Sequence, residues 1–336
     1  MISRSPLRED RPDWRRELSE AYSDPLELLR MLELDSEKIG YAPAAAHLFP
    51  FRVTRYYANL IEPRTPADPL LLQILPQTQE MLSATGFEAE PLAESRDAQG
   101  NSLLAKYQQR VLLMVSGACA IHCRYCFRRS FPYNDFVGHR RLSDAITRLE
   151  QDPEIKEVIL SGGDPLVIDD AALGELVRRL EAVPHISRLR IHSRLPVVLP
   201  SRLTPGLLEV LRATRLRTVL VLHINHPREV TQALGDALIP WRQSGLTLLN
   251  QAVLLRGVND DPETLEELSE KLFDAGVLPY YVHLLDRVSG SAHFEVTDAR
   301  AREIETDLRT RLPGYLMPRF VREVNGEPYK VPLAAT

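Results

Sequence analysis

The three cysteines of this 336-residue chain lie within one short run, and their spacing points to an iron–sulfur cluster. Cys119, Cys123 and Cys126 form a C-x3-C-x2-C pattern, and the sequence contains no other cysteine. Three neighbouring thiolates can hold three corners of a [4Fe–4S] cluster and leave the fourth iron without a protein ligand. An iron with an open coordination position can bind and cleave a substrate, so the pattern favours catalysis over simple electron storage.

Other uses of these cysteines fit the sequence less well. Disulfides are disfavoured because the number is odd and no signal peptide or apolar segment of membrane length precedes the cysteines, which predicts a cytoplasmic, reducing location. Structural zinc would need a fourth ligand, which His122 or His139 would have to supply. Inert thiols are usually scattered, whereas these are flanked by Arg128 and Arg129. The iron–sulfur interpretation is therefore preferred.

The composition limits the classes of partner. The formal net charge is −5 and no basic tract is present, so we expect no nucleic-acid partner. No apolar run is long enough to cross a bilayer, so we expect no membrane partner. A chain of this length suits one large domain with an appendage.

Short apolar runs alternate with helical patterns from about residue 105 onward, and this alternation predicts the scaffold. Six runs have the composition of buried strands: 111–115, 157–161, 189–193, 218–222, 246–250 and 277–285. Amphipathic stretches such as 169–182 and 261–275 lie between them, and crossovers of that length connect parallel strands. We therefore predict an α/β fold, an incomplete (β/α)6 barrel over 105–312, with an N-terminal helical region (1–104) and a C-terminal segment (313–336).

Polar residues gather just after the predicted strands. They include Asp164, Arg194, His223, Asn250 and His283. Ligands of parallel α/β folds bind beyond the carboxyl ends of the strands, so we expect the functional site at this edge of the sheet.

The cysteine pattern, with Tyr125 before the third cysteine and the run 161–165 (Ser-Gly-Gly-Asp-Pro) after the next strand, resembles the radical S-adenosylmethionine (SAM) enzymes. The resemblance implies their incomplete barrel, a [4Fe–4S] cluster, SAM bound to its open iron, and an external reducing electron donor. It also implies that Tyr125 lies near the adenine and that Gly162, Gly163 and Asp164 contact the methionine amino group. Taken alone, Tyr125 would be a packing residue and the glycines a turn.

Longer motifs resemble the lysine 2,3-aminomutase family over about residues 103–331. They are the runs 126–129, 162–166, 193–200, 250–259 and 279–281. The resemblance implies an isomerase that also uses pyridoxal 5′-phosphate (PLP), bound as a Schiff base to a lysine in a C-terminal tail. Lys330 matches that lysine, although the glycine run of the family is reduced here to Gly326. Lys106 and Arg110 fall where the family places two arginines for the PLP phosphate.

Further matches imply the substrate. Arg128 corresponds to the arginine that binds the substrate carboxylate, and a guanidinium suits that geometry. Asp286 and Glu323 match two acidic groups that hold the distant ammonium of lysine, and each would contribute on the order of 4 kcal/mol at an effective dielectric of about 20, before desolvation. The implied reaction moves the amino group of L-lysine from C2 to C3 after a 5′-deoxyadenosyl radical removes a hydrogen from the β-carbon.

Within the family, the runs 123–129 and 192–196 resemble the enzymes of bacterial elongation factor P (EF-P) β-lysylation, the EpmB type. That resemblance implies (R)-β-lysine as the product and a functional link to EF-P and its lysyl ligase. Three alternatives stay open: an aminomutase acting on free lysine or another amino acid in catabolism, a radical SAM enzyme without PLP, and a non-catalytic iron–sulfur redox sensor.

Overall fold

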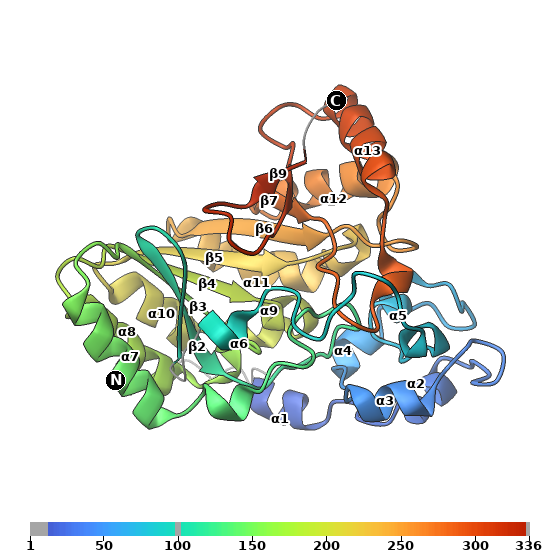
Figure 1. Cartoon of the computed structure of the whole chain (residues 1–336), viewed down its shortest axis with the longest axis horizontal. Helices are drawn as coiled ribbons and strands as arrows, with labels where there is room; N and C mark the ends of the chain where they lie inside the picture. Colours follow the sequence, from blue (N-terminus) through green and yellow to red (C-terminus); the bar gives the residue numbers. More distant parts are fainter. Residues whose placement is uncertain (1–12, 98–101, 334–336) are drawn as a thin grey trace, which may run out of the picture.

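A single sheet of nine strands organises the chain, whose computed structural model describes residues 13–97 and 102–333. The strands are hydrogen-bonded in chain order, and the central ones follow one another up the picture in Figure 1. Seven of them run parallel: β2 (Arg110–Ser116), β3 (Glu157–Gly162), β4 (Arg188–Ser193), β5 (Arg217–His223), β6 (Thr247–Val253), β7 (Leu278–His283) and β8 (Arg319–Arg322). At the edges, β1 (Leu103–Tyr107) and β9 (Val331–Pro332) run antiparallel to their neighbours.

Helices connect successive parallel strands, as the sequence predicted. The main ones are α7 (His139–Gln151), α8 (Asp170–Glu181), α10 (Pro205–Ala213), α11 (Gln232–Gln243), α12 (Pro262–Asp274) and α13 (Asp298–Arg311), with the short α9 (Leu195–Val198) before α10. Several begin at an Asp or Thr whose side chain accepts a backbone N–H of the first turn, for example Asp169, Thr231 and Asp261. The predicted incomplete (β/α)6 barrel is confirmed.

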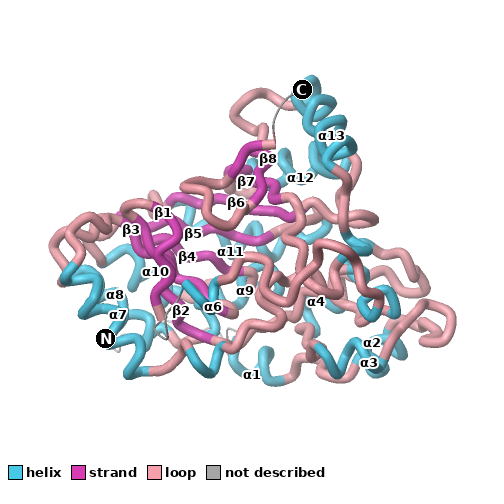
Figure 2. Tube along the Cα trace, in the orientation of Figure 1, coloured by secondary structure: helices cyan, strands magenta, loops and turns pink. Residues whose placement is uncertain are grey.

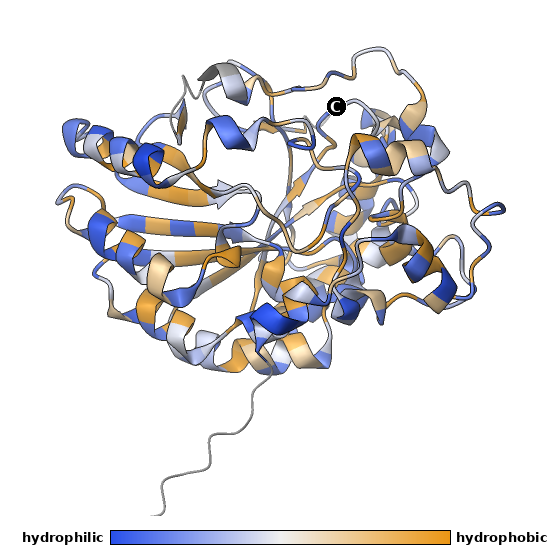
Figure 3. Cartoon of the chain, turned by 90° about the horizontal axis from the view of Figure 1, so that it is seen from below, coloured by the Kyte–Doolittle hydropathy of each residue, from blue (hydrophilic) through white to orange (hydrophobic). Residues whose placement is uncertain are grey.

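The core lies between the sheet and these helices. Alternate residues of the central strands, such as Leu160, Ile191 and Leu220, are almost completely buried. Figure 3 shows the hydrophobic colour concentrated on the strands and on the helix faces that meet them. None of the helices within residues 13–97 and 102–333 has the length and apolar character needed to span a membrane.

Short helices and loops of the N-terminal region cover the carboxyl ends of the strands (Figures 1 and 2). The helices are α1 (Trp14–Ser19), α2 (Pro25–Met31), α3 (Pro43–Leu48), α4 (Arg55–Ala58), α5 (Pro69–Leu72) and α6 (Glu94–Asp97). Their buried residues, including Leu28, Tyr57 and Leu70, belong to the same apolar cluster as the strands. The sheet also continues into the C-terminal segment through β8, so the division into three parts remains a prediction.

The sheet does not close into a full barrel, because the strand order runs from β1 to β9 without a bond between these two edges. Side chains bridge the opening instead. Lys106 and Tyr107 of β1 both donate hydrogen bonds to Glu323, which directly follows β8. The open side of the barrel is therefore joined by polar side chains.

Two glycines at the end of β3 allow the backbone that leads into the cysteine loop to pack directly against this strand. A Cβ on Gly162 would lie 2.3 Å from the carbonyl oxygen of Ser116, and one on Gly163 would lie 2.4 Å from that of Ala118. The backbone N–H of Gly163 donates to the Ser116 carbonyl oxygen at 2.7 Å. Gly162 also has a φ of 125°, which side chains disfavour. The glycines are thus required by a close backbone contact.

We expect Gly162→Ala to lower the free energy of unfolding by about 2 kcal/mol or more, because the new methyl group meets fixed backbone at a positive φ. Gly235→Ala is the matched control, since that glycine lies inside α11 with open space around it and alanine there should stabilise by up to about 1 kcal/mol. Urea unfolding of both variants in one cofactor state gives the comparison. Equal unfolding midpoints would contradict the argument.

Candidate active site

The three cysteines lie in the loop after β2, and all have free, partly buried thiols. The N–H of Cys126 donates to the Cys123 carbonyl oxygen at 3.0 Å, which folds the loop into a turn. Burial raises the pKa of the Cys119 thiol and raises that of Cys126 to about 11. Thiolates form in such surroundings when a metal supplies the compensating positive charge. The donor set therefore fits a cluster with three protein ligands.

The zinc alternative finds no support around this loop. The Nδ1 atom of His122 lies 2.9 Å from the carbonyl oxygen of Pro50, and its ring packs on Phe49. Among the residues that the structure describes, no three His, Cys, Asp or Glu side chains gather so that they could hold one metal ion. A four-iron cluster binds its cysteines through different iron atoms, so it does not need that convergence.

The N-terminal region braces the cysteine loop through a buried carboxylate. Glu80 accepts hydrogen bonds from Arg124 at 2.7 and 2.8 Å and from Arg129 at 2.7 Å, and the Glu80 side chain is only 1% exposed. The backbone N–H of Arg124 also donates to the Gln73 carbonyl oxygen at 2.9 Å. Removing one partner of such a buried pair leaves an uncompensated charge. This network fixes the path of the loop.

The Gly-Gly-Asp run lies beside the cysteines, but the Asp164 side chain is already occupied. Its carboxylate accepts four hydrogen bonds, from Ser193 Oγ at 2.7 Å and from the backbone N–H groups of Leu166, Arg194 and Leu195 at 2.8 to 3.0 Å. That this carboxylate faces the ammonium group of SAM stays a prediction. Asp164 ties the ends of β3 and β4 together.

Tyr125 is buried below the loop. Its hydroxyl accepts hydrogen bonds from Asn225 at 2.6 Å and from Arg194, and its ring packs edge-on against Phe294. Arg194 also donates to the sulfur of Cys123 at 2.7 Å and to Glu229 at 3.1 Å. A role of Tyr125 beside an adenine stays a prediction.

Arg128 reaches away from the loop and meets a carboxylate of the N-terminal region. Its Nε and Nη2 atoms donate to the two oxygens of Glu94 at 2.6 and 3.1 Å, and both side chains are less than 10% exposed. Its Nη1 atom donates to Ser161 Oγ at 2.9 Å and to the Gly162 carbonyl oxygen at 3.1 Å. Burial alone would lower the pKa of Arg128, but the Glu94 carboxylate outweighs burial and raises it.

Lys330 and Lys106, far apart in sequence, converge on one carboxylate. Glu323 accepts a hydrogen bond from the ammonium of Lys330, another from Lys106 at 3.2 Å, and a third from the hydroxyl of Tyr107. The Glu323 side chain is 7% exposed. Burial would raise the pKa of Glu323, but the two ammonium groups dominate and lower it to about 2. The guanidinium of Arg110 lies over the ring of Tyr107, 4.5 Å from the ring centre.

Asp286 lies near this cluster, but its pKa is shifted in the opposite direction to that of Glu323. Burial, reinforced by the charge of Glu323, raises the pKa of Asp286 to about 7. The neighbouring His283 has a pKa lowered to about 3, by burial and then by the Lys330 ammonium. Glu323 is therefore charged throughout the neutral pH range, whereas Asp286 gains or loses its proton within that range.

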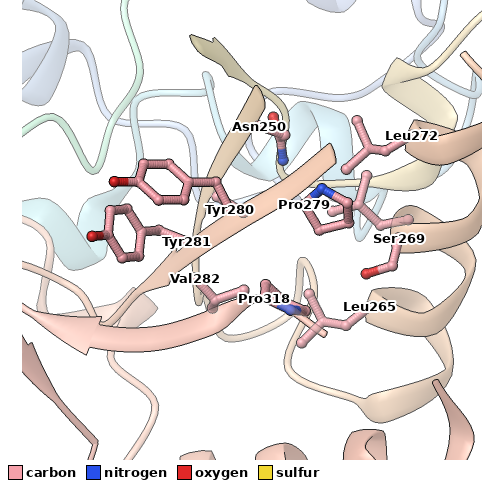
Figure 4. A pocket seen from close by; sticks show the side chains of 11 residues that line it. Asn250, Leu265, Ser269, Leu272, Pro279, Tyr280, Tyr281, Val282 and Pro318 are labelled. Carbon is pink, nitrogen blue, oxygen red and sulfur yellow. The ribbon is translucent and has the colours of Figure 1, made fainter. Parts of the chain in front are cut away.

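A cavity of about 260 Å³ opens onto Asp286 and Glu323. The N-terminal segment around Glu88 forms one wall, and its backbone pairs with the loop after β7, with Glu88 N–H donating to the Arg287 carbonyl oxygen at 2.9 Å. A second cavity, between β7 and α12 (Figure 4), holds only about 10 Å³, roughly one water. The adjacent Tyr280 and Tyr281 rings are 3.8 Å apart. The larger cavity is therefore the candidate ligand site.

The predicted residues thus fall into two groups in the structure. The loop group comprises Cys119, Cys123, Cys126, Tyr125, Gly162, Gly163, Asp164 and Arg128. The tail group comprises Lys106, Arg110, Asp286, Glu323 and Lys330. Sequence reasoning missed Tyr107 and Glu94, which complete the hydrogen bonding of Glu323 and Arg128. Tyr107 could have been suspected from its place beside Lys106, whereas nothing in the sequence marks Glu94.

Comparison with known proteins adds family relationships. Residues 108–188 match the family described as 4Fe-4S single cluster domain. An Escherichia coli protein named L-lysine 2,3-aminomutase is 48% identical over 96% of this chain and 95% of its own length. Proteins of the same name from Haemophilus influenzae (44% identity, 98% of each chain) and Clostridium subterminale (35%, 96% of this chain and 77% of that protein) are also similar. A solved radical SAM methyltransferase from Sphaerobacter thermophilus is a distant likeness, with a TM-score of 0.47 and 18% identity over 67% of this chain and 70% of that chain.

The pKa of Asp286 predicts how this site affects stability. The folded chain keeps a proton up to about pH 7 that the unfolded chain loses near pH 3.8, so this contribution to stability is complete at low pH and is lost as pH rises through 7. Asp286→Asn should therefore gain in free energy of unfolding, relative to the unsubstituted chain, between pH 5 and pH 8.5. The exposed Asp236→Asn is the control. Parallel stability curves for Asp286→Asn and the unsubstituted chain would refute the shift.

Proposed function

The chain belongs to the L-lysine 2,3-aminomutase family, and on that premise we propose that it makes (R)-β-lysine from L-lysine for the modification of EF-P. As a member of the family it is a radical SAM isomerase that uses a [4Fe–4S] cluster, SAM and PLP. The observation that best supports lysine as the substrate is the convergence of Lys330 and Lys106 on Glu323, beside Asp286. The placement of individual residues in the site is part of the proposal.

The residues present fit both cofactors. Cys119, Cys123 and Cys126 would hold the cluster; Lys330 would hold PLP, and Lys106 and Arg110 would face its phosphate. When bound, the cluster and SAM supply a carbon radical that removes a hydrogen atom from the substrate, and PLP stabilises the radical while the amino group moves. Lys330 is partly screened from water, since its side chain is 24% exposed. The chain's own task is to position the substrate and to exclude water.

The charges of the site match lysine at both ends. Arg128 has the planar donor set that a carboxylate binds, and it already holds one in Glu94. At the other end Glu323 is paired with the ammonium of Lys330, so a substrate ammonium has the right charge and donors to replace it. Above about pH 7 the ionised Asp286 adds a second negative charge. A glutamate side chain would instead bring its carboxylate against these two acids.

The proposed destination of the product rests on the resemblance of residues 123–129 and 192–196 to the EF-P β-lysylation group. A role in catabolism of free lysine is the competing possibility, and the product's fate separates the two.

The decisive assay supplies the reconstituted protein with SAM, dithionite and either L-lysine or L-glutamate. We expect β-lysine of R configuration from lysine, and turnover of glutamate at least about a hundredfold slower, because its side chain would face Asp286 and Glu323. The product is resolved on a chiral column and then offered, with the lysyl ligase, to EF-P. Preference for glutamate would contradict the assignment of lysine as the substrate. An S product, or one that the ligase rejects, would contradict only the role in EF-P modification.

The lysine that carries PLP is tested by trapping. Borohydride reduction of the PLP-loaded protein should leave a stable pyridoxyl adduct on the peptide that contains Lys330, seen by mass spectrometry, and Lys330→Ala should lose both the adduct and turnover. Lys271→Ala is the control, because the Lys271 side chain, in the last turn of α12, is 42% exposed and its Nζ pairs with the Glu267 carboxylate at 2.7 Å. An adduct that persists in Lys330→Ala would show that another lysine holds the cofactor.

A further inference from the structure

The pair of Arg128 N–H groups that suits a carboxylate, here called its donor edge, already binds a carboxylate of the protein, that of Glu94. A guanidinium has five N–H groups, and a carboxylate binds best to two parallel ones. Glu94 takes such a pair, from Nε and Nη2, while Ser161 and Gly162 take the two N–H groups of Nη1. One N–H, on Nη2, is left over. A substrate carboxylate could therefore make only a single hydrogen bond while Glu94 stays in place.

Charge makes simultaneous binding of both carboxylates costly. Arg128 and Glu94 have side chains that are only 7% and 8% exposed, so water screens them poorly. A second carboxylate beside Glu94 would place two anions against one cation, and like charges in a buried site repel strongly. Exchange of one carboxylate for another keeps the guanidinium paired, so displacement is the less costly route.

Glu94 lies in a short segment whose backbone conformation is unfavourable at the preceding residue. It begins the four-residue helix α6, and the residue before it, Ala93, has a φ of 50°, which is unfavourable for alanine. The same segment carries Glu88, whose backbone pairs with the loop after β7 that holds Asp286. Pro91 and Leu92 of this segment line the candidate ligand cavity, and Glu94 follows them two residues later. Glu94 is a buried carboxylate to which the proposed reaction gives no task.

We propose that Glu94 sets the affinity of the site for its substrate, because the α-carboxylate of lysine binds by displacing Glu94 from Arg128. This inference rests on the proposed function, which makes Arg128 the carboxylate-binding residue. In the structure Glu94 neutralises Arg128, and a ligand must bring its own carboxylate to replace it. The residue therefore favours ligands with a free α-carboxylate and lowers the affinity for all of them.

The test measures binding rather than turnover. The protein loaded with cluster, PLP and SAM, but without reductant, is titrated with L-lysine in a calorimeter. Removal of the competitor in Glu94→Gln and Glu94→Ala should lower the Kd for lysine at least about tenfold, which corresponds to about 1.4 kcal/mol. Glu37→Gln removes an equal charge from an exposed position of the N-terminal region that does not line the cavity, and it should leave the Kd unchanged.

A second arm uses acetate as a probe that needs only the Arg128 donor edge. Acetate should raise the melting temperature of Glu94→Ala and compete with lysine there, and it should do neither in the unsubstituted chain. If the unsubstituted chain binds lysine but both Glu94 variants bind it equally well or more weakly, Glu94 merely orients Arg128 and the inference fails. If no variant binds lysine but acetate still raises the melting temperature of Glu94→Ala, the proposed function is wrong. The conclusion that Glu94 occupies the carboxylate-binding N–H groups of Arg128 would then still hold.

Discussion

The pairing of buried ions at the carboxyl ends of the strands is the constraint on which the site depends. An ion without a partner in such a place costs several kcal/mol, so each cation must meet a carboxylate. The partners come from distant parts of the chain: Glu80 for Arg124, Glu94 for Arg128, and Glu323 for Lys106. The N-terminal region therefore supplies counter-ions to the cysteine loop as well as covering it, and the loop cannot take its path without that region.

The same pairing explains how a buried, charged site can admit a charged substrate. In the structure the Glu94 carboxylate lies on Arg128, so a group of the protein stands in for the carboxylate of an amino acid. Arg128 then does not have to pass through a state in which it is buried alone. If Lys330 is bound to PLP, as proposed, its ammonium no longer lies on Glu323, and a substrate ammonium can take that place while Lys106 and Tyr107 keep their hydrogen bonds to the carboxylate.

The scaffold and the motif residues could be predicted from the sequence because both are local signals. A buried strand such as β3 shows as a continuous apolar run, and the three cysteines are marked by their spacing. The strands β8 and β9, with four and two residues, are too short to show any period. The pairs Glu94–Arg128 and Tyr107–Glu323 join residues 34 and 216 positions apart, so only the folded sheet reveals them. The four hydrogen bonds that Asp164 accepts could not be predicted from the sequence, because three of their donors lie in residues 193–195, about 30 positions away.

The open side of the barrel is itself a requirement of this site. The edge strand β1 carries Lys106 and Tyr107, and the opposite edge, formed by β8 and β9, carries Glu323 and Lys330. In a closed barrel these edges would be joined by backbone hydrogen bonds at the spacing of neighbouring strands, about 4.8 Å, and no side chain would fit between them. Because the sheet stays open, long polar side chains meet across the gap, next to the strand that carries the cysteine loop. In the function proposed above, a substrate held across this gap would lie beside the strand that carries the cysteine loop, whereas a fully hydrogen-bonded barrel would fill that space with its own core.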